Sequence, residues 1–353
     1  MDVADKAVAG TQGPGTTLPV TDRAGQREGE DRRAPALTTA TSEARGSYYG
    51  IPPIKKPHWK WEIVLYFFIG GIASGAYTIA TIAEVVGGRR YAHIIRVGRY
   101  IALPCLAVSP LLLIKDLGKP SRFYNMLRIF KIKSPMSMGT WGLVGFSGFA
   151  ALSTAAELAE QGFMRGSVPA RLALLLPRRL IGRVGSFFAV FVGGYTGVLL
   201  SATTVPLWAR NRQFLGPTFI SSALSTGAAA ITAALVATGH DDHETLAPLE
   251  EIEAVALVTE LSMLAAQGLN SGRLAQPLLS GKYSTLFLPG VGLGMVLPLL
   301  AQLNGLLRGR RTRAGHLLTS VLVLLGGLIL RYTLIYAGKQ TADDPQAYFE
   351  QTK

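Results

Sequence analysis

The sequence is poor in cysteine and in charged residues, and each shortage excludes a class of protein. Cys105 is the only cysteine among 353 residues, which excludes an internal disulfide and an iron–sulfur cluster held by this chain alone. Charged residues make up 16% of the chain against 49% hydrophobic residues, and the mean hydropathy is +0.30. Soluble domains carry about 25% charged residues. The composition therefore predicts a membrane protein.

The hydrophobic residues gather into eight long runs. About 20 apolar residues in a helix cross the hydrocarbon core of a bilayer, and helices are expected because lipid cannot satisfy backbone amides and the runs lack the alternation of barrel strands. The predicted spans are 62–86, 94–114, 138–158, 181–207, 214–238, 251–269, 286–307 and 315–337. The sixth is short and opens with charges, and without it the two termini would lie on opposite sides. We predict an all-α, eight-helix integral membrane bundle.

Histidine is scarce as well. A membrane protein with two haems needs pairs of histidines deep in facing helices. The five histidines, His58, His93, His240, His243 and His316, all fall in predicted loops or at the ends of predicted spans. Their placement argues against a dihaem cytochrome b.

Residues 1–46 differ from the rest of the sequence, because they contain no aromatic residue and no isoleucine. Such a segment cannot bury enough apolar surface to fold, so we expect a disordered tail. It begins with Asp2 and Asp5 and lacks the apolar core of a cleavable leader, so the first span is expected to act as the insertion signal. The predicted organisation is a tail over 1–46, a membrane domain over 47–340 and a short polar tail over 341–353.

The net charge of +13 arises in the membrane portion, because the tail contributes seven acids and six bases. Basic loops are typical of membrane topology and of contact with anionic lipid headgroups, and they do not point to nucleic acid. The basic residues divide almost evenly between the two sides, so the positive-inside rule barely decides the orientation. If the loop after the second span is basic for docking, the opposite side is cytoplasmic and both termini are outside.

Four segments carry a resemblance to a known family. They are WEIVLYFFIGGIASG (61–75), SPLLLIKDLGKPSRFYNMLRIFKIKSPMSMGTW (109–141), YTGVLLSATTVPLW (195–208) and RYTLIYAG (331–338). Together they resemble the membrane subunits of the NrfD/polysulfide reductase family. The resemblance implies a multi-pass subunit in the plasma membrane, without haem or an iron–sulfur cluster of its own. It also implies an exchangeable menaquinone or ubiquinone, a ferredoxin-like iron–sulfur partner and a molybdopterin catalytic subunit.

A quinone site is expected at the start of the first span. Glu62 and Tyr66 lie one turn apart and share a helix face, and quinone chemistry needs groups that bind the ring oxygens and exchange protons. By the resemblance, they fall where a relative has an amide and an imidazole in contact with quinone, and Tyr195 matches a third contact, a tyrosine. The alternatives are a water-facing carboxylate at a helix start and ordinary packing or interfacial anchoring of the two tyrosines.

The basic loop between the second and third spans is the expected partner-docking surface. Gly118 and Pro120 favour a turn that lets Asp116 and Arg122 pair, which leaves basic side chains to face an acidic iron–sulfur partner. The alternative is a cluster that faces headgroups or sets topology. The predicted docking residues are Asp116, Arg122, Arg128, Lys131, Ser134 and Met136.

Ionisable residues inside membrane helices are costly and are usually paired or functional. Glu260 in the sixth span and Arg331 in the eighth therefore form either a buried ion pair or part of a proton path that includes Glu84 and Glu157. The acidic segment 240–253 is expected to be a solvated loop, and no metal site is predicted. A secondary transporter or proton-conducting protein without a redox role remains the alternative function.

Overall fold

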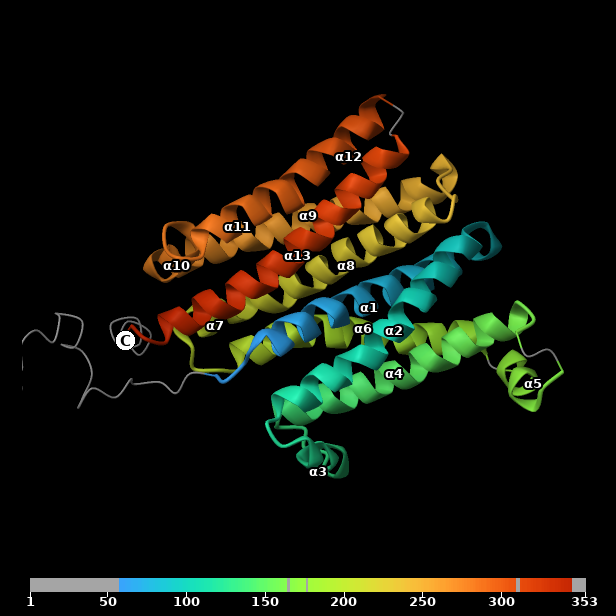
Figure 1. The fold of residues 1–353 in the computed structure, drawn as a ribbon, viewed down its shortest axis with the longest axis horizontal. Helices are drawn as coiled ribbons and strands as arrows, with labels where there is room; N and C mark the ends of the chain where they lie inside the picture. The colour runs from blue at the N-terminus through green and yellow to red at the C-terminus, as the bar shows by residue number, and fades with distance from the viewer. Residues whose placement is uncertain (1–56, 164–165, 176, 309–311, 345–353) are drawn as a thin grey trace, which may run out of the picture. The chain divides into compact units, whose positions relative to one another are not determined.

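The computed structural model describes residues 57–163, 166–175, 177–308 and 312–344, and all regular structure within them is helical (Figure 1). The predicted tail over 1–46 lies outside the described residues, and the C-terminal tail is described only to residue 344. The long helices are α1 (Trp61–Val86), α2 (Ala92–Asp116), α4 (Pro135–Glu160), α6 (Arg178–Ser201), α8 (Arg212–Ala237), α9 (His243–Ser271) and α13 (Arg313–Thr341). Another long segment joins α11 (Ser284–Val291), the π-helix η6 (Gly292–Val296) and α12 (Leu297–Arg308).

Short helices connect these elements. They are η3 (Gly88–Tyr91), η4 (Pro120–Arg122), α3 (Phe123–Arg128), α5 (Val168–Leu174), α7 (Pro206–Arg210), η5 (Gly272–Ala275) and α10 (Gln276–Leu279). Within the described residues, eight helical segments are long and apolar enough to cross a membrane. The eight-helix membrane bundle expected from the sequence is thereby confirmed.

Two predicted span boundaries are wrong. The fourth helix ends at Ser201 and not near Leu207, because Pro206 starts the separate helix α7 and its preceding residue, Val205, is extended, as residues before proline usually are. The sixth helix begins at His243, eight residues before the predicted start.

The early start of α9 corrects the prediction that 240–253 is a loop. Asp242 caps the helix by accepting a hydrogen bond from the backbone N–H of Thr245 at 3.0 Å, an N-cap arrangement that satisfies a free amide. A hydrogen bond from the Thr245 side chain lowers the pKa of the Asp242 carboxyl, so the charged, cap-forming state persists into acid solution.

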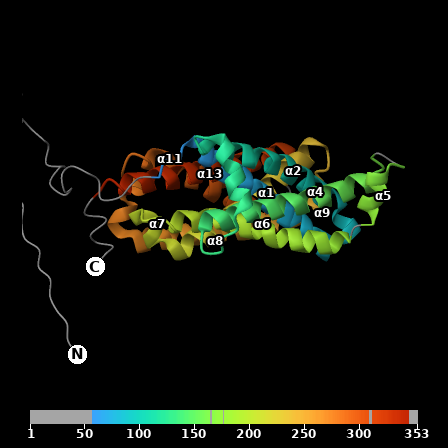
Figure 2. The same cartoon turned by 90° about the horizontal axis from the view of Figure 1, so that it is seen from below.

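The long segments run alternately up and down, and they stay close to parallel in the turned view of Figure 2. Two ends of the bundle can therefore be named from the first helix. The Trp61 end holds the start of α1, the loop between α2 and α4, helices α7 and α10, and the end of α13. The Val86 end holds the turns after α1 and α8, the end of α12, the start of α13 and helix α5.

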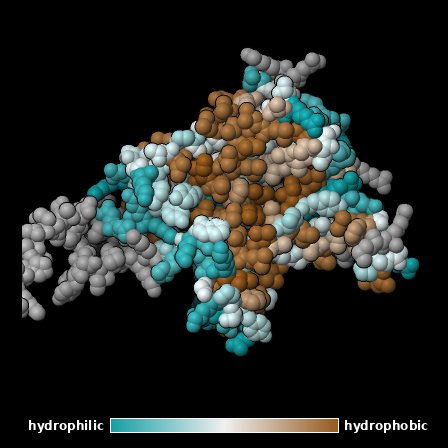
Figure 3. Space-filling view, viewed as in Figure 1, coloured by the Kyte–Doolittle hydropathy of each residue, from teal (hydrophilic) through white to brown (hydrophobic). Residues whose placement is uncertain are grey.

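Helix α1 lies at the centre and packs against α2, α6, α8 and α13. Its closest approach is to α8, where a Cβ built on Gly75 would collide with the backbone of Ala223 and one built on Gly227 with the backbone of α1. Small residues permit such close backbone contact between membrane helices. A broad hydrophobic band crosses the outer surface of the bundle (Figure 3), as expected where lipid replaces water.

Candidate functional site

Glu62 lies at the Trp61 end with its carboxylate mostly buried. Its Oε1 is 3.5 Å from Nζ of Lys115, whose side chain is 59% exposed and also lies over the ring of Trp61. The second oxygen, Oε2, is buried and has no hydrogen-bond partner among the described residues. An ionised carboxylate can accept several hydrogen bonds, so Glu62 retains an unused acceptor inside the bundle.

Tyr66 lies one turn along α1 from this carboxylate, and Tyr195 lies near Tyr66 on the facing helix α6. Tyr66, one turn along α1 from Glu62, is buried, and no hydrogen bond to its hydroxyl is formed by the described residues. Tyr195 on α6 is buried too and donates a hydrogen bond to the carbonyl of Pro135. The two phenols are close enough to interact electrostatically. The structure therefore brings together the three residues that the sequence singled out at this end.

Two further groups at the Trp61 end were not assigned to the quinone site from the sequence. Tyr336 of α13 lies close enough to Glu62 for an electrostatic interaction, and so does Asp116 at the end of α2. Tyr336 belongs to the segment RYTLIYAG that carried the family resemblance, so the signal was present. Three helices, α1, α2 and α13, thus contribute ionisable groups around one carboxylate.

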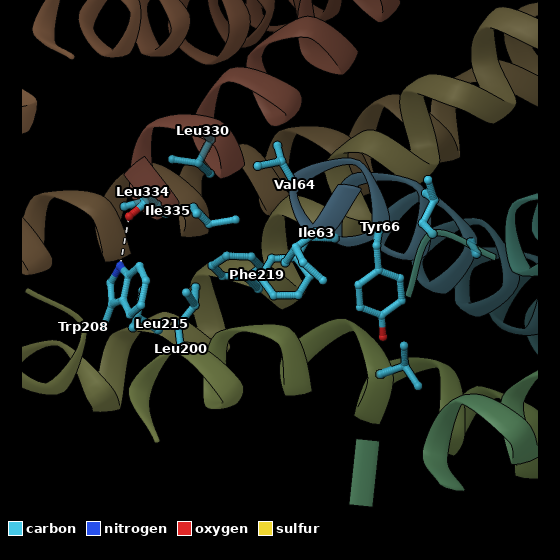
Figure 4. Close-up of a cluster of buried hydrophobic side chains, with 14 of the residues drawn as sticks. Ile63, Val64, Tyr66, Leu200, Trp208, Leu215, Phe219, Leu330, Leu334 and Ile335 are labelled. Carbon is cyan, nitrogen blue, oxygen red and sulfur yellow. Dashed lines mark hydrogen bonds between the residues drawn. The ribbon is translucent and has the colours of Figure 1, made fainter. Parts of the chain in front are cut away.

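A set of aromatic contacts fixes the start of α1. Trp59 stacks on Trp208 with ring centroids 5.4 Å apart, and Trp208 donates to the carbonyl of Leu334 at 2.9 Å. Lys339 donates to the carbonyl of Trp59. Figure 4 shows Trp208 and Tyr66 as members of the same cluster of buried side chains, at opposite sides of the view. The site therefore sits on a rigid support, as a precise binding site requires.

The loop between α2 and α4 has a defined shape. Gly118 adopts a positive φ of 69°, which glycine tolerates best, and the backbone then forms η4 and α3. Ser137 donates to the carbonyl of Ile129 at 3.1 Å and accepts from the backbone of Lys131 at 3.0 Å, while Phe130 packs edge-on against Trp141. The loop is thus folded back on the start of α4 and projects from the bundle (Figure 1).

The predicted docking residues divide into two groups. Arg122, Arg128, Lys131 and Met136 are exposed or partly exposed, so they form a basic outer surface, which is hydrophilic over α3 in Figure 3. The remaining two have structural roles. Ser134 caps α4 by accepting from the backbone N–H of Ser137. Asp116 accepts from the backbone N–H of Lys60, and no ion pair with Arg122 is formed in the described part of the sequence.

Glu260 and Arg331 are both 1% exposed and meet through serines of α8. Oε2 of Glu260 accepts from Ser225 at 3.0 Å, and Arg331 donates to Ser222 at 2.9 Å. No direct ion pair within 4.0 Å joins the two charges among the described residues. Arg331 also donates to the carbonyl of Phe67 at 3.1 Å. Ser225 also bonds the backbone carbonyl of Ser222 at 3.2 Å, so two serines of one helix turn lie between the carboxylate and the guanidinium.

The Val86 end contains an ionic cluster that the sequence did not predict. Arg99, 1% exposed, lies 2.5 Å from Glu84 of α1 and 3.3 Å from Glu157 of α4. Arg178 of α6 lies 2.6 Å from Glu157 and also pairs with Glu160. The only signal in the sequence was a run of charges at the ends of apolar spans, which also fits topology. Glu84 and Glu157 are therefore held in ion pairs.

Helix α9 carries two more buried carboxylates. Glu250 lies 3.1 Å from Nδ1 of His316, and Glu253 accepts from Gln302 at 2.5 Å. These contacts explain why the acidic start of α9 is helical and inside the bundle. Among the described residues, no group of three or more His, Cys, Asp or Glu side chains is arranged to hold a metal ion.

These features place the protein in the class of multi-pass helical membrane proteins, with buried ionisable groups and a basic loop at one end. A family model described as polysulphide reductase, NrfD, matches residues 54–343. The protein therefore belongs to the NrfD family, whose members are membrane subunits of oxidoreductase complexes.

Three relatives cover most of this sequence. It is 28% identical to a subunit of the polysulfide reductase of Wolinella succinogenes, over 80% of its own length and 94% of the relative. It is 27% identical to a protein NrfD homolog of Haemophilus influenzae and 28% identical to protein NrfD of Escherichia coli K12, in both cases over 80% of its own length and 95% of the relative.

Proposed function

We propose that this protein is the quinone-binding subunit of an oxidoreductase complex in the plasma membrane and passes electrons between the quinone pool and an iron–sulfur subunit. The main support is the buried Glu62 oxygen that has no hydrogen-bond partner in the described part of the chain and lies one turn from Tyr66, beside the loop that carries the family resemblance. A menaquinone or ubiquinone would bind at this position as an exchangeable cofactor.

The residues at the Trp61 end fit a quinone. The quinone supplies reversible uptake of electrons and protons at its ring oxygens. Glu62 can accept a hydrogen bond from a reduced ring or take up its proton, and Tyr66 can donate to a ring oxygen. Lys115, exposed at the bundle surface, stabilises the Glu62 carboxylate and lies where a proton can leave for water.

The proposed partner is a ferredoxin-like subunit that docks on the loop between α2 and α4, with a molybdopterin catalytic subunit beyond it. The support is the exposed basic surface around Arg128 and Lys131, since complementary charge favours association with an acidic partner. This surface and Glu62 lie at the same end of the bundle, so electrons would travel a short way between cluster and ring.

We further propose that Glu260 takes part in proton transfer linked to this reaction. Its carboxylate accepts from Ser225, and Arg331 donates to Ser222 in the same turn of α8 and to the carbonyl of Phe67, the residue after Tyr66. Replacing Glu260 by Gln keeps the hydrogen bonds to the serines and removes the exchangeable charge. The expected result is slower proton release by the complex in proteoliposomes during quinol oxidation. Proton release at the wild-type rate contradicts this role.

The test of the quinone site uses the purified complex and a water-soluble quinol. Glu62→Gln and Tyr66→Phe should each lower quinol-linked turnover at least about a hundredfold, the lower end of the range for a lost acid or base, with the complex still assembled. Glu244→Gln and Tyr91→Phe, which alter the same residue types at the Val86 end, should leave turnover unchanged. Normal quinol kinetics in both site variants would remove the assignment, and solute uptake by proteoliposomes without quinol activity would favour a transporter.

The docking surface is tested separately. Arg128→Glu combined with Lys131→Glu should release the iron–sulfur subunit during affinity purification. The expected loss is about tenfold in affinity at low salt and smaller at high salt, because exposed charge interactions are screened. Arg212→Glu with Lys282→Glu reverses equal charge at the same end of the bundle and should retain the partner. Equal retention by both double variants contradicts docking on the loop.

A further inference from the structure

Helix α5 lies outside the bundle proper, at the Val86 end (Figure 1). It connects α4, which ends at Glu160, with α6, which begins at Arg178. Only three residues separate the end of α5 from α6, and seven separate the end of α4 from its start. Because α4 and α6 are both long and apolar enough to cross the membrane, α5 is held at the level where the bilayer meets water.

The two faces of α5 have opposite surroundings. Ala170 and Ala173, three positions apart, are buried at 8% exposure each, and α5 packs on α4. On the opposite face, Val168, Leu172 and Leu175 follow one another at the i, i+4, i+7 spacing of a single helix stripe. Their exposures are 67%, 60% and 80%. The small residues thus face the protein, while the large apolar ones face outward.

The exposed cations around α5 have no acidic partner among the described residues. Arg171, Arg179 and Arg183 are exposed and form no ion pair there, unlike Arg178, which is bound to Glu157 and Glu160. The sequence contains no aspartate or glutamate between Glu160 and Asp241. A partner for this segment must therefore bring the negative charge itself.

We propose that α5 is an interfacial anchor that binds anionic phospholipid. The stripe of Val168, Leu172 and Leu175 lies among the acyl chains, and the three exposed arginines hold the phosphates of the headgroups. An amphipathic helix in this position is buried about 5–10 Å into the boundary between headgroups and acyl chains. The attachment to α4 through the alanine face fixes its depth.

Lipid suits this surface better than a soluble protein partner. The exposed leucines are a few residues from two membrane-spanning helices, so a soluble protein would have to displace lipid to reach them. The combination of an apolar stripe with flanking arginines is the pattern that anionic leaflets attract. Anionic lipid is concentrated in the cytoplasmic leaflet, so the proposal also assigns the Val86 end to the cytoplasm.

The depth of α5 is tested with the full-length protein in nanodiscs. In a Cys105→Ala background, an environment-sensitive fluorophore is placed on Leu172→Cys or on Asp241→Cys, an exposed control position in the turn between α8 and α9 at the same end. Lipids brominated on the acyl chain should quench the Leu172 probe at least about threefold more than the control probe, given the depth of an interfacial helix. Equal quenching overturns the proposal, and so does disulfide-linked dimer formation by Leu172→Cys.

The headgroup preference is tested by native mass spectrometry of the protein from mixed phosphatidylcholine and phosphatidylglycerol nanodiscs. The wild-type protein should retain phosphatidylglycerol, and Arg171→Gln with Arg179→Gln and Arg183→Gln should reduce retention at least about fivefold. Replacing Arg90, Arg210 and Arg212 by Gln removes the same charge elsewhere and should change retention little. Equal loss in the two triple variants, or no preference for phosphatidylglycerol in the wild type, refutes anionic lipid binding at α5.

Discussion

The two ends of α1 each carry a buried glutamate, but the surroundings of the two carboxylates differ. Glu84 is bound at 2.5 Å by Arg99, a cation with 1% exposure that also reaches Glu157. Glu62 has a lysine at 3.5 Å whose side chain is 59% exposed, and one of its oxygens has no partner among the described residues. One carboxylate is fully engaged inside the protein, and the other keeps bonding capacity for a ligand.

The difference indicates that the Val86 end of α1 contributes mainly to stability and the Trp61 end mainly to function. A buried ion pair is strongly destabilising to break, because one charge is left without a partner. A carboxylate with a weak, exposed partner can exchange protons at small structural cost. Mutations at the Val86 end should therefore act on the amount of folded protein, and mutations at the Trp61 end should act on turnover.

The largest effect is expected for Arg99→Met. The substitution removes the fully buried cation between Glu84 and Glu157 and leaves them only the partly exposed Arg178 as a shared partner, so the loss should approach about 3–5 kcal/mol. The measurement is the free energy of unfolding by SDS titration in mixed micelles. The double variant Glu84→Gln with Arg99→Met removes both charges of one pair and should recover part of the loss. No destabilisation by Arg99→Met would mean that the cluster is hydrated.

A direct comparison of Glu84→Gln and Glu62→Gln should separate the two ends. Glu84→Gln weakens the charge-assisted bond to Arg99 and should lower stability by about 1–3 kcal/mol. Its specific quinol turnover, corrected for folded protein, should stay near that of the wild type. Glu62→Gln should show the reverse pattern, with stability within about 1 kcal/mol and turnover lost. If both variants lost stability and turnover to the same extent, the two ends of α1 would not differ in role.

Arg178→Gln should have an intermediate effect on stability. Arg178 binds Glu157 at 2.6 Å and also Glu160, but its side chain is 25% exposed, so water can replace part of the lost hydrogen bonding. We expect a loss of about 1–2 kcal/mol, smaller than for Arg99→Met. Arg179→Gln, at an exposed neighbour without an ion pair among the described residues, is the matched control for stability. If Arg178→Gln lowered the free energy of unfolding as much as Arg99→Met, water would be excluded from Arg178 as fully as from Arg99.

Much of the fold could be predicted from the sequence, because length and hydropathy decide which helices cross a bilayer. The failures lie at boundaries where local signals conflict with tertiary contacts. Glu250 and Glu253 suggested a solvated loop, but His316 and Gln302, from distant parts of the sequence, satisfy them inside the bundle. The end of the fourth span was misplaced because apolar composition continues past the break at Pro206.

The candidate site could be predicted only where local spacing along one helix determines which residues are close. Glu62 and Tyr66 share one helix face, so their proximity follows from spacing alone. The approach of Tyr195 and Tyr336 depends on how α6 and α13 pack on α1, which no local pattern specifies. Arg99 and Arg178 resembled the topogenic charges that flank many membrane helices, and only the packing of four helices shows that they are bound to carboxylates.

The smallest effect on stability is expected for Lys115→Met. The side chain of Lys115 is 59% exposed and its 3.5 Å contact with Glu62 is open to solvent, and pairs of this kind contribute about 0–1 kcal/mol. Methionine retains most of the apolar stem that lies over Trp61. Unfolding should therefore be unchanged within that range, whereas quinol turnover should fall, because Glu62 loses the nearest cation. Lys119→Met, just beyond the end of α2 and without an ion pair to Glu62 in the described residues, should leave turnover unchanged. If Lys115→Met destabilised the protein as much as Glu84→Gln does, the Trp61 end would be as tightly bound as the Val86 end, and its carboxylate could not be the one left available to a ligand.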